Sequence, residues 1–294
     1  MLKSICVVGH ITQDRIINSN ETRNQPGGTA YYFCKALKDF DANCSLVTAV
    51  SRSLMPVVSE LRQEGIQVTA LPSDDSTFFE NKYRLNQDHR EQKILAVASS
   101  FTRDNFPEVE SHYFHLGPLL KHDIDPVLMK HLATKGKISL DTQGLLRHFK
   151  GERIIPSNWE DRNEILPMVE ILKANEQEAA TLTGYTNVKE AAQSLFDHGV
   201  KEVIITLGSQ GSLIYNGHEY FQVPAFIPKA VVDATGCGDT YMAGYLIRRA
   251  EGDSIQEAGQ FGAAMATLKI EDFGPFSGST QSVVNVIKTR SIHC

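Results

Sequence analysis

Short apolar runs of strand length alternate with helix-like segments along most of the chain. The runs are continuous rather than interrupted by polar residues, as at Ile5–Val8, Cys44–Val50 and 202–207. Strands that helices bury on both faces have this composition and belong to parallel sheets. The chain has 294 residues, 41% of them hydrophobic and 22% charged, which suffices for one large domain. The pattern predicts an α/β fold with three layers, in which helices cover both faces of a mostly parallel central sheet.

Two segments depart from this alternation. Residues 16–25 resemble a short extended excursion, and residues 77–97 resemble two strands around a polar turn at 86–90. We expect residues of about 11–25 and 76–98 to form a small β lid on a single domain spanning residues 1–294. The exposed edge of the 77–97 ribbon could pair with another subunit, so the expected state is a monomer or a homodimer through the lid.

Charge and cysteine content narrow the partners and the compartment. The net charge is −6, from 29 basic and 35 acidic residues without a basic cluster, so neither nucleic acid nor a membrane surface is an expected partner. The first apolar run ends at Gly9 and is too short for a signal peptide or a membrane span. The five cysteines are odd in number and form no C-x-x-C pair, which favours reduced thiols and a cytoplasmic location.

A glycine loop connects the end of a strand to a helix within residues 231–246. Gly236 and Gly238 permit close approach of the backbone to a ligand, and the N–H groups that open the helix are suited to hold an anion. Asp239 stands beside them as a carboxylate that could accept a proton from a hydroxyl nucleophile. An ordinary turn in which Asp239 caps the helix explains the same residues equally well.

Polar residues also follow other expected strands. Asp14 lies just beyond the first strand, and the strand at Lys137–Asp141 leads to Gln143 and Arg147. Because open α/β sheets bind ligands at the carboxyl ends of their strands, these side chains are suited to a polyhydroxy ligand. A solvated loop or local capping remains the alternative. Further along, the spacing of Asn175 and Glu178 predicts a capping box, which by itself explains both residues structurally.

Taken together, these motifs resemble the ribokinase-like (PfkB) carbohydrate kinase family from about Ile5 to Gly274. The strongest match is the D-x-x-G-x-G-D signature at residues 233–239. The resemblance implies that Asp239 is the catalytic base and that Gly236, Cys237 and Gly238 form an anion hole. Cys237 stands where the family usually has alanine, and we expect little effect because the anion hole uses backbone N–H groups.

The resemblance further implies ATP and Mg²⁺ as donor and metal. The family's N-x-x-E motif is present at Asn175 and Glu178, which would organise Mg²⁺ and phosphate, usually through water. The T-x-G-x-x-G pattern, with two further positions, would bind the nucleotide. The residues implied in nucleotide binding are Thr206, Gly208, Gly211, Thr235 and Gly274.

The acceptor site departs from the ribokinase pattern. Tyr32 stands where ribokinases carry an asparagine after the glycine pair, and Thr12 replaces a second asparagine, so ribose is doubtful. The surrounding motifs resemble the inositol-kinase-like branch instead, in which the fork of Arg147 would match a vicinal diol. The residues implied in acceptor binding are Asp14, Gly27, Gly28, Tyr32, Gln143 and Arg147.

The expected function is therefore transfer of the γ-phosphate of ATP to a hydroxyl of a sugar or a cyclitol, an inositol-like ring. Two alternatives stay open. A nucleoside or vitamin-like alcohol could be the acceptor, since proteins of this fold use such substrates. The chain could also be a non-catalytic ligand-binding relative, against which the intact Asp239 and glycine loop argue.

Overall fold

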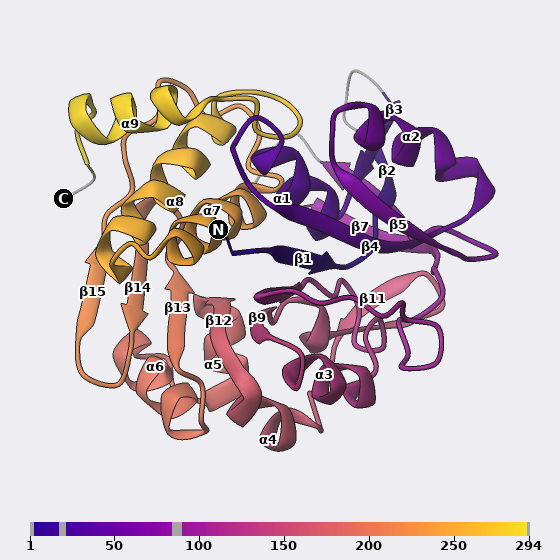
Figure 1. The fold of residues 1–294 in the computed structure, drawn as a ribbon, viewed down its shortest axis with the longest axis horizontal. Helices are drawn as coiled ribbons and strands as arrows, with labels where there is room; N and C mark the ends of the chain where they lie inside the picture. Colours follow the sequence, from indigo (N-terminus) through magenta and orange to yellow (C-terminus); the bar gives the residue numbers. More distant parts are fainter. Residues whose placement is uncertain (1–2, 18–21, 84–89, 293–294) are drawn as a thin grey trace.

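Nine strands form the central sheet of the computed structural model, which describes residues 3–17, 22–83 and 90–292 (Figure 1). Their order across the sheet is β15-β14-β13-β12-β9-β8-β1-β4-β5. The bounds are β1 (Ile5–Val8), β4 (Cys44–Val50), β5 (Gln67–Pro72), β8 (Tyr113–Leu116), β9 (Lys137–Asp141), β12 (Val169–Asn175), β13 (Glu202–Thr206), β14 (Ser212–Tyr215) and β15 (Tyr220–Val223). All pairs from β13 to β5 are parallel, whereas the pairs β13–β14 and β14–β15 are antiparallel, so only β14 runs against the other strands. The mostly parallel sheet is confirmed.

Helices cover both faces of this sheet, giving three layers (Figure 1). Alternate residues of β1 show the division, since Ile5 and Val7 pack in one core and Cys6 and Val8 in the other. The first core contains helices α1 (Thr29–Leu37), α2 (Met55–Gln63), α7 (Cys237–Glu251), α8 (Ile255–Ile270) and α9 (Thr280–Thr289). The second contains α3 (Pro126–Ala133), α4 (Arg162–Ile165), α5 (Glu176–Thr183) and α6 (Val188–Asp197). Among the described helices none has the length and apolarity that a membrane span requires.

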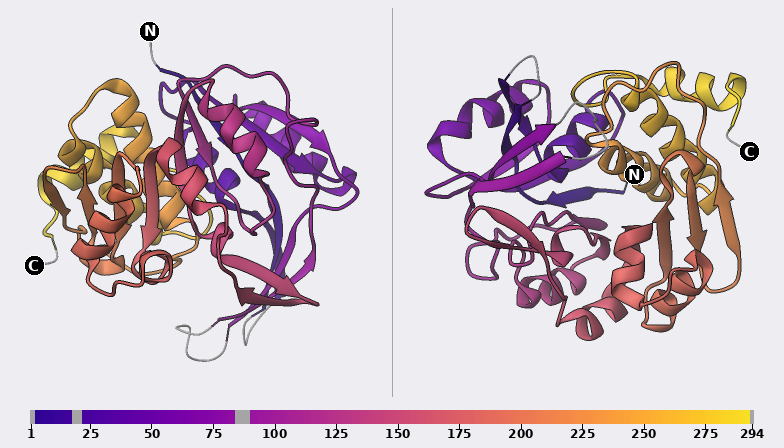
Figure 2. Two further views of the ribbon diagram at one scale, coloured as in Figure 1. Left: turned by 90° about the horizontal axis from the view of Figure 1, so that it is seen from below. Right: turned by 180° about the vertical axis from the view of Figure 1, so that it is seen from behind.

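A second, smaller sheet of six strands projects from this body (Figure 2). Its order is β10-β11-β7-β6-β2-β3, antiparallel except for the parallel pair of β2 and β6. The bounds are β2 (Thr12–Ile17), β3 (Thr22–Gly27), β6 (Phe78–Tyr83), β7 (Arg90–Ala96), β10 (Arg147–Lys150) and β11 (Arg153–Pro156). The segments expected as a lid thus join one sheet. Residues 18–21 and 84–89 of the expected lid, which include most of the expected turn, lie outside the described residues.

Two features of the second sheet differ from the sequence prediction. Strands β10 and β11 were not expected, because two runs of four residues carry too little periodicity to reveal a strand. The prediction that the 77–97 ribbon has an exposed edge is also wrong. Strand β6 pairs with β2 and β7, and β7 pairs with β6 and β11. The edges of the second sheet are therefore β3 and β10.

Candidate active site

The glycine loop, residues 233–238, lies between two cavities. One, the polar pocket, has a volume of about 210 Å³ and is bounded by the glycine loop and by both sheets. The other, the apolar cavity, has a volume of about 630 Å³ and lies against α8 and the ends of β13 and β14. Ala234 and Gly238 line both, so this loop forms the wall that the two cavities share.

Gly236 sets the geometry of the loop. It is the N-cap of α7 and has φ 77°, a left-handed conformation that favours glycine. A Cβ atom at this position would lie 2.3 Å from the ring of Tyr32, so the close packing of loop and ring also requires glycine. Asp239 is the third residue of α7 and its side chain does not cap the helix. The capping alternative for Asp239 is therefore wrong, and its carboxylate lines the polar pocket instead.

Asp14 reaches the polar pocket from β2. Its Oδ1 accepts a hydrogen bond of 2.7 Å from Thr12 Oγ1, and the side chain is buried. Thr12 is paired with Gly27 on β3, where a Cβ atom would approach Asp14 Oδ2 to 2.5 Å. Gly28, the N-cap of α1, has φ 91° and leaves no room for a side chain beside the carbonyl of His10. Gly27 thus makes space for the Asp14 carboxylate at the pocket wall, and Gly28 makes space for the His10 carbonyl beside it.

Tyr32, predicted to contact the acceptor, is a buried residue of α1 at the wall of the polar pocket. Its ring lines the polar pocket but the residue is only 2% exposed. The buried Oη has no hydrogen-bond partner among the described residues. Burial, reinforced by Asp233, Asp14 and Asp239, raises the pKa of this phenol, so it stays protonated. Tyr32 therefore shapes the pocket and supports the glycine loop.

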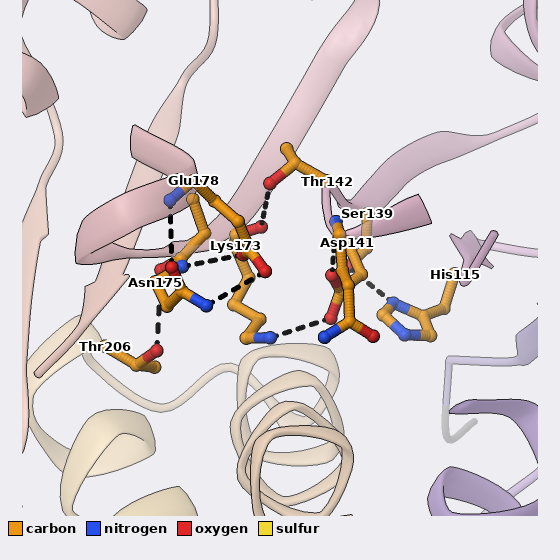
Figure 3. A network of polar contacts seen from close by, with 10 residues as sticks. His115, Ser139, Asp141, Thr142, Lys173, Asn175, Glu178 and Thr206 are labelled. Carbon is orange, nitrogen blue, oxygen red and sulfur yellow. Dashed lines mark hydrogen bonds and ion pairs between the residues drawn. The ribbon is translucent and has the colours of Figure 1, made fainter. Parts of the chain in front are cut away.

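Lys173 is a site residue that the sequence analysis missed. It lies on β12 directly opposite Asp141 of β9, and its Nζ donates a 2.8 Å hydrogen bond to Asp141 Oδ2 (Figure 3). Both side chains are buried and both line the polar pocket. A Cβ atom at Gly238 would lie 3.1 Å from this Nζ, so the ammonium also faces the glycine loop. The signal was a lysine between the apolar residues Leu172 and Ala174 in the middle of a strand, since buried lysines are rare unless paired.

Opposing effects fix the charges of this pair. Burial alone would raise the pKa of Asp141, but the Lys173 ammonium and the backbone N–H of Gln143 outweigh it and lower that pKa. Burial would lower the pKa of Lys173, but Asp141, Glu178 and Asp239 raise it. The two side chains therefore remain an ion pair, with a fixed positive charge between the pocket and the loop.

The second sheet supplies the outer wall of the polar pocket. Phe79 from β6, Gln92 from β7 and Arg147 from β10 line it together with Asp14. Gln143 lies before β10, and its backbone N–H donates to Asp141 Oδ1 at 3.0 Å. The pocket thus lies between the two sheets, with the predicted acceptor contacts mainly on the second sheet and Asp239 on α7 of the main body.

Asp239 has the pKa that a general base at neutral pH needs. Burial, with the nearby Asp141 carboxylate, raises the pKa of Asp239 to about 6. The Lys173 ammonium and a hydrogen bond with Thr29 oppose this rise. A base titrating near the operating pH combines a deprotonated fraction with proton affinity.

Asn175 and Glu178 form the predicted capping box of α5 (Figure 3). Asn175 Oδ1 accepts from the Glu178 N–H at 2.9 Å, and Glu178 Oε2 accepts from the Asn175 N–H at 2.8 Å. Burial and the Asp141 carboxylate raise the pKa of Glu178. Within the described residues, no group of three or more His, Cys, Asp or Glu side chains could hold a metal ion.

The apolar cavity contains most of the residues predicted to bind a nucleotide. Of the five predicted residues, Thr206, Gly208 and Gly211 line it, together with Cys237 of the predicted anion hole and small side chains from α8 such as Ala263. Gly211 has φ 96°, and a Cβ there would lie 2.0 Å from the carbonyl of Val223. The other two predicted residues lie elsewhere. Thr235 lines the polar pocket, and the Gly274 N–H donates to Asp233 Oδ2 at 3.3 Å.

Comparisons with known proteins show which family and which folds the chain resembles. Residues 2–281 match a family model described as pfkB family carbohydrate kinase. A cytidine kinase of Thermococcus kodakarensis is 26% identical over 93% of this chain and 98% of its own. An inositol 3-kinase of Arabidopsis thaliana is 22% identical over 92% of this chain and 75% of its own. A solved pyrophosphate-dependent kinase in the ribokinase family, complexed with a pyrophosphate analog and myo-inositol, superposes with a TM-score of 0.85 at 25% identity, covering 93% of this chain and 97% of that chain.

Proposed function

Because the chain belongs to the pfkB family of carbohydrate kinases, phosphotransferases with alcohol acceptors, we propose that it phosphorylates a small polyol with ATP. The observation that carries the proposal is that the glycine loop lines both the polar pocket and the apolar cavity. An acceptor hydroxyl on one side and a donor phosphate on the other would meet at its N–H groups. Asp239 lies at that junction and would take the hydroxyl proton.

We propose a cyclitol as the acceptor. The polar pocket is small and is lined by carboxylates and donors such as Asp14, Gln143 and Arg147, which suit the many hydroxyls of a ring polyol. Apolar side chains from Phe79 and Leu119 cover part of the wall, as suits the face of a carbon ring. The inositol 3-kinase and the kinase solved with myo-inositol support this choice.

We propose ATP rather than pyrophosphate as the donor. The apolar cavity beside the glycine loop has room for a nucleotide base, and small residues such as Ala225, Ala263 and Ala266 keep it open. Pyrophosphate would leave this apolar volume unused. Because the solved pyrophosphate-dependent kinase has a similar fold, the choice between ATP and pyrophosphate must be tested by experiment.

The site residues fit Mg²⁺ in an indirect role. Both carboxylate oxygens of Glu178 accept hydrogen bonds from Asn175, yet each keeps a lone pair for a metal-bound water. When bound, Mg²⁺ would neutralise phosphate charge. The Lys173 ammonium supplies a further positive charge next to the glycine loop without any metal.

We propose that residues 1–294 form one domain whose second sheet acts as a lid over the polar pocket. Closure of such a lid excludes water from a phosphoryl donor, so ATP hydrolysis without acceptor should be slow. A homodimer through the lid would use the edge strand β3 or β10. A cytoplasmic location remains a prediction.

An acceptor screen tests the proposal. The protein is incubated with Mg²⁺ and either ATP or pyrophosphate, and with cyclitols including myo-inositol, simple sugars including ribose, and nucleosides including cytidine. We expect phosphorylation of a cyclitol with ATP, lost in Asp239→Asn. Turnover with pyrophosphate alone would refute the donor assignment. No turnover with any pair, in folded protein, would favour a ligand-binding relative.

A nucleoside acceptor is the second candidate. The cytidine kinase relative spans nearly the whole chain and supports it. The polar pocket argues against it, since Phe79 and Leu119 offer little apolar surface for a base. Phosphorylation of cytidine with a higher kcat/KM than any cyclitol would establish this alternative.

A further inference from the structure

Lys269 is a fully buried lysine outside both cavities. It lies in the last turn of α8, and its side chain is 0% exposed. Its Nζ donates to the Asp233 carbonyl at 2.7 Å, to Asp233 Oδ2 at 3.0 Å and to the Asp272 carbonyl at 3.5 Å. Burying an ammonium is costly unless oxygen atoms surround it in this way.

The oxygens around Lys269 belong to the two backbone segments that frame the glycine loop. Asp233 is the first residue of the loop, and its Oδ1 accepts from the Thr235 N–H at 2.9 Å. Asp233 Oδ2 also accepts from the Gly274 N–H at 3.3 Å. The ammonium thus joins α8, the start of the loop and the turn at 272–274 through a single charged centre.

We propose that Lys269 is a positioning residue that acts as the built-in cation of the glycine loop. Without a positive charge, the Asp233 carboxylate and the two carbonyl oxygens would be left facing one another in a buried space. The loop would then relax away from the geometry in which its N–H groups face a phosphoryl group. The catalytic consequence rests on the proposed function, whereas the cation-binding consequence does not.

The first pair of variants, Lys269→Met and Lys35→Met, tests whether the charge of Lys269 matters rather than its packing. Lys269→Met keeps most of the volume and removes the charge, and we expect kcat to fall about a hundredfold with little change in the acceptor KM. Lys35→Met is the matched control, because Lys35 is also buried and bonds Glu64 at 2.7 Å, but between α1 and α2. A Lys269→Met enzyme with kcat within about twofold of wild type would overturn the proposal.

Cation rescue provides the second test. Lys269→Ala leaves a cavity lined by the three oxygens, so ammonium or methylammonium should restore much of kcat and raise the unfolding temperature. Tetramethylammonium at equal ionic strength should do neither, and wild type and Lys269→Met should not respond. The proposal would be overturned if all three cations changed the kcat and unfolding temperature of Lys269→Ala equally, or if no cation changed them. If Lys269→Ala folds only when ammonium is present, that dependence supports it. If it does not fold even then, kcat of Lys269→Met decides.

The unfolding-temperature measurement tests the role of Lys269 independently of the proposed kinase function. It uses no substrate, so a shift produced by ammonium supports the cation site even if the acceptor screen finds no kinase activity. If the wild type is an active kinase and the Lys269→Met substitution leaves kcat unchanged, the proposed function stands and the proposed role of Lys269 is refuted.

Discussion

Lys173 and Asp141 face each other on neighbouring strands, and their buried side chains form an ion pair with an Nζ to Oδ2 distance of 2.8 Å. The pair lies where the polar pocket meets the glycine loop. It therefore holds a positive charge at the point where a phosphoryl group would be transferred, and it leaves Asp141 unable to act as a free base.

Removing one partner of this pair should be costly for stability. Lys173→Met would leave the Asp141 carboxylate buried without its cation, and we expect the free energy of unfolding to fall by about 3–5 kcal/mol. Urea denaturation followed by circular dichroism measures the change. The double variant Lys173→Met/Asp141→Asn removes both charges and should recover most of the stability but little activity. A double variant as unstable as the single one would contradict the ion-pair explanation.

Asp239→Asn should abolish most turnover in folded protein. Loss of a general base typically lowers kcat by about two to four decades. Asp125→Asn is a suitable control, because Asp125 caps α3 away from the site and asparagine also caps well. In wild type, kcat/KM should rise with pH through about 6 and then level off, since Asp239 must be deprotonated. A kcat/KM profile that stays flat from about pH 5 to about pH 8 would argue against this base.

The same aspartate should weaken the fold at neutral pH. Its pKa is about 6 in the folded protein and 3.8 in the reference state, so the folded state binds this proton more tightly. The contribution of Asp239 to stability is therefore lost as pH rises between these two values. Asp239→Asn should unfold at a higher temperature than wild type near neutral pH, and the gain should shrink in acid. Calorimetric scans at several pH values measure both, and a gain independent of pH would contradict the ionisation argument.

Gly27→Ala tests the cradle around Asp14. The added Cβ would lie 2.5 Å from Asp14 Oδ2 and 2.9 Å from Thr12 Oγ1, so the carboxylate must move. We expect the acceptor KM to rise about tenfold or more, with the ATP KM almost unchanged. Steady-state kinetics with each substrate varied distinguishes the two. Equal increases in both KM values would indicate a general loss of structure.

Ala225→Phe tests the donor assignment by filling the apolar cavity, which Ala225 lines. The phenyl ring should compete with a nucleotide base and raise the ATP KM, whereas the KM of inorganic tripolyphosphate, a donor without a base, should change little. Lining residues of the polar pocket are untouched, so the acceptor KM should stay constant. An unchanged ATP KM would place the base elsewhere.

Local patterns predicted the features that depend on local chemistry. The apolar runs identified the parallel strands, and the spacing of Asn175 and Glu178 identified the capping box. Long-range pairing was harder to predict. Strand β11 pairs with β7 at a single register pair, Arg153 with Lys93. No local sequence pattern predicts this pairing. Lys173 was overlooked because its partner Asp141 lies 32 residues earlier in the chain.

The N-cap of α7 shows a second limit. Both Gly236 and Asp239 were compatible with opening the helix, and only the left-handed backbone of Gly236, packed on the Tyr32 ring, decides between them. Such packing depends on an element about two hundred residues earlier in the sequence. The carboxylate proposed as the base could be predicted from the motif, but the fact that it does not cap α7 could not.

The polar pocket draws its two walls from different sheets. Asp14, Phe79, Gln92 and Arg147 belong to the second sheet, whereas Lys173 on β12 and Asp239 on α7 belong to the main body. Under the proposed function, substitutions that alter which acceptor is selected can accumulate on the first wall without disturbing the groups proposed for phosphoryl transfer on the other. The scaffold thus separates substrate choice from chemistry, and exchanging side chains of the second sheet is a direct route to redesigning the acceptor range.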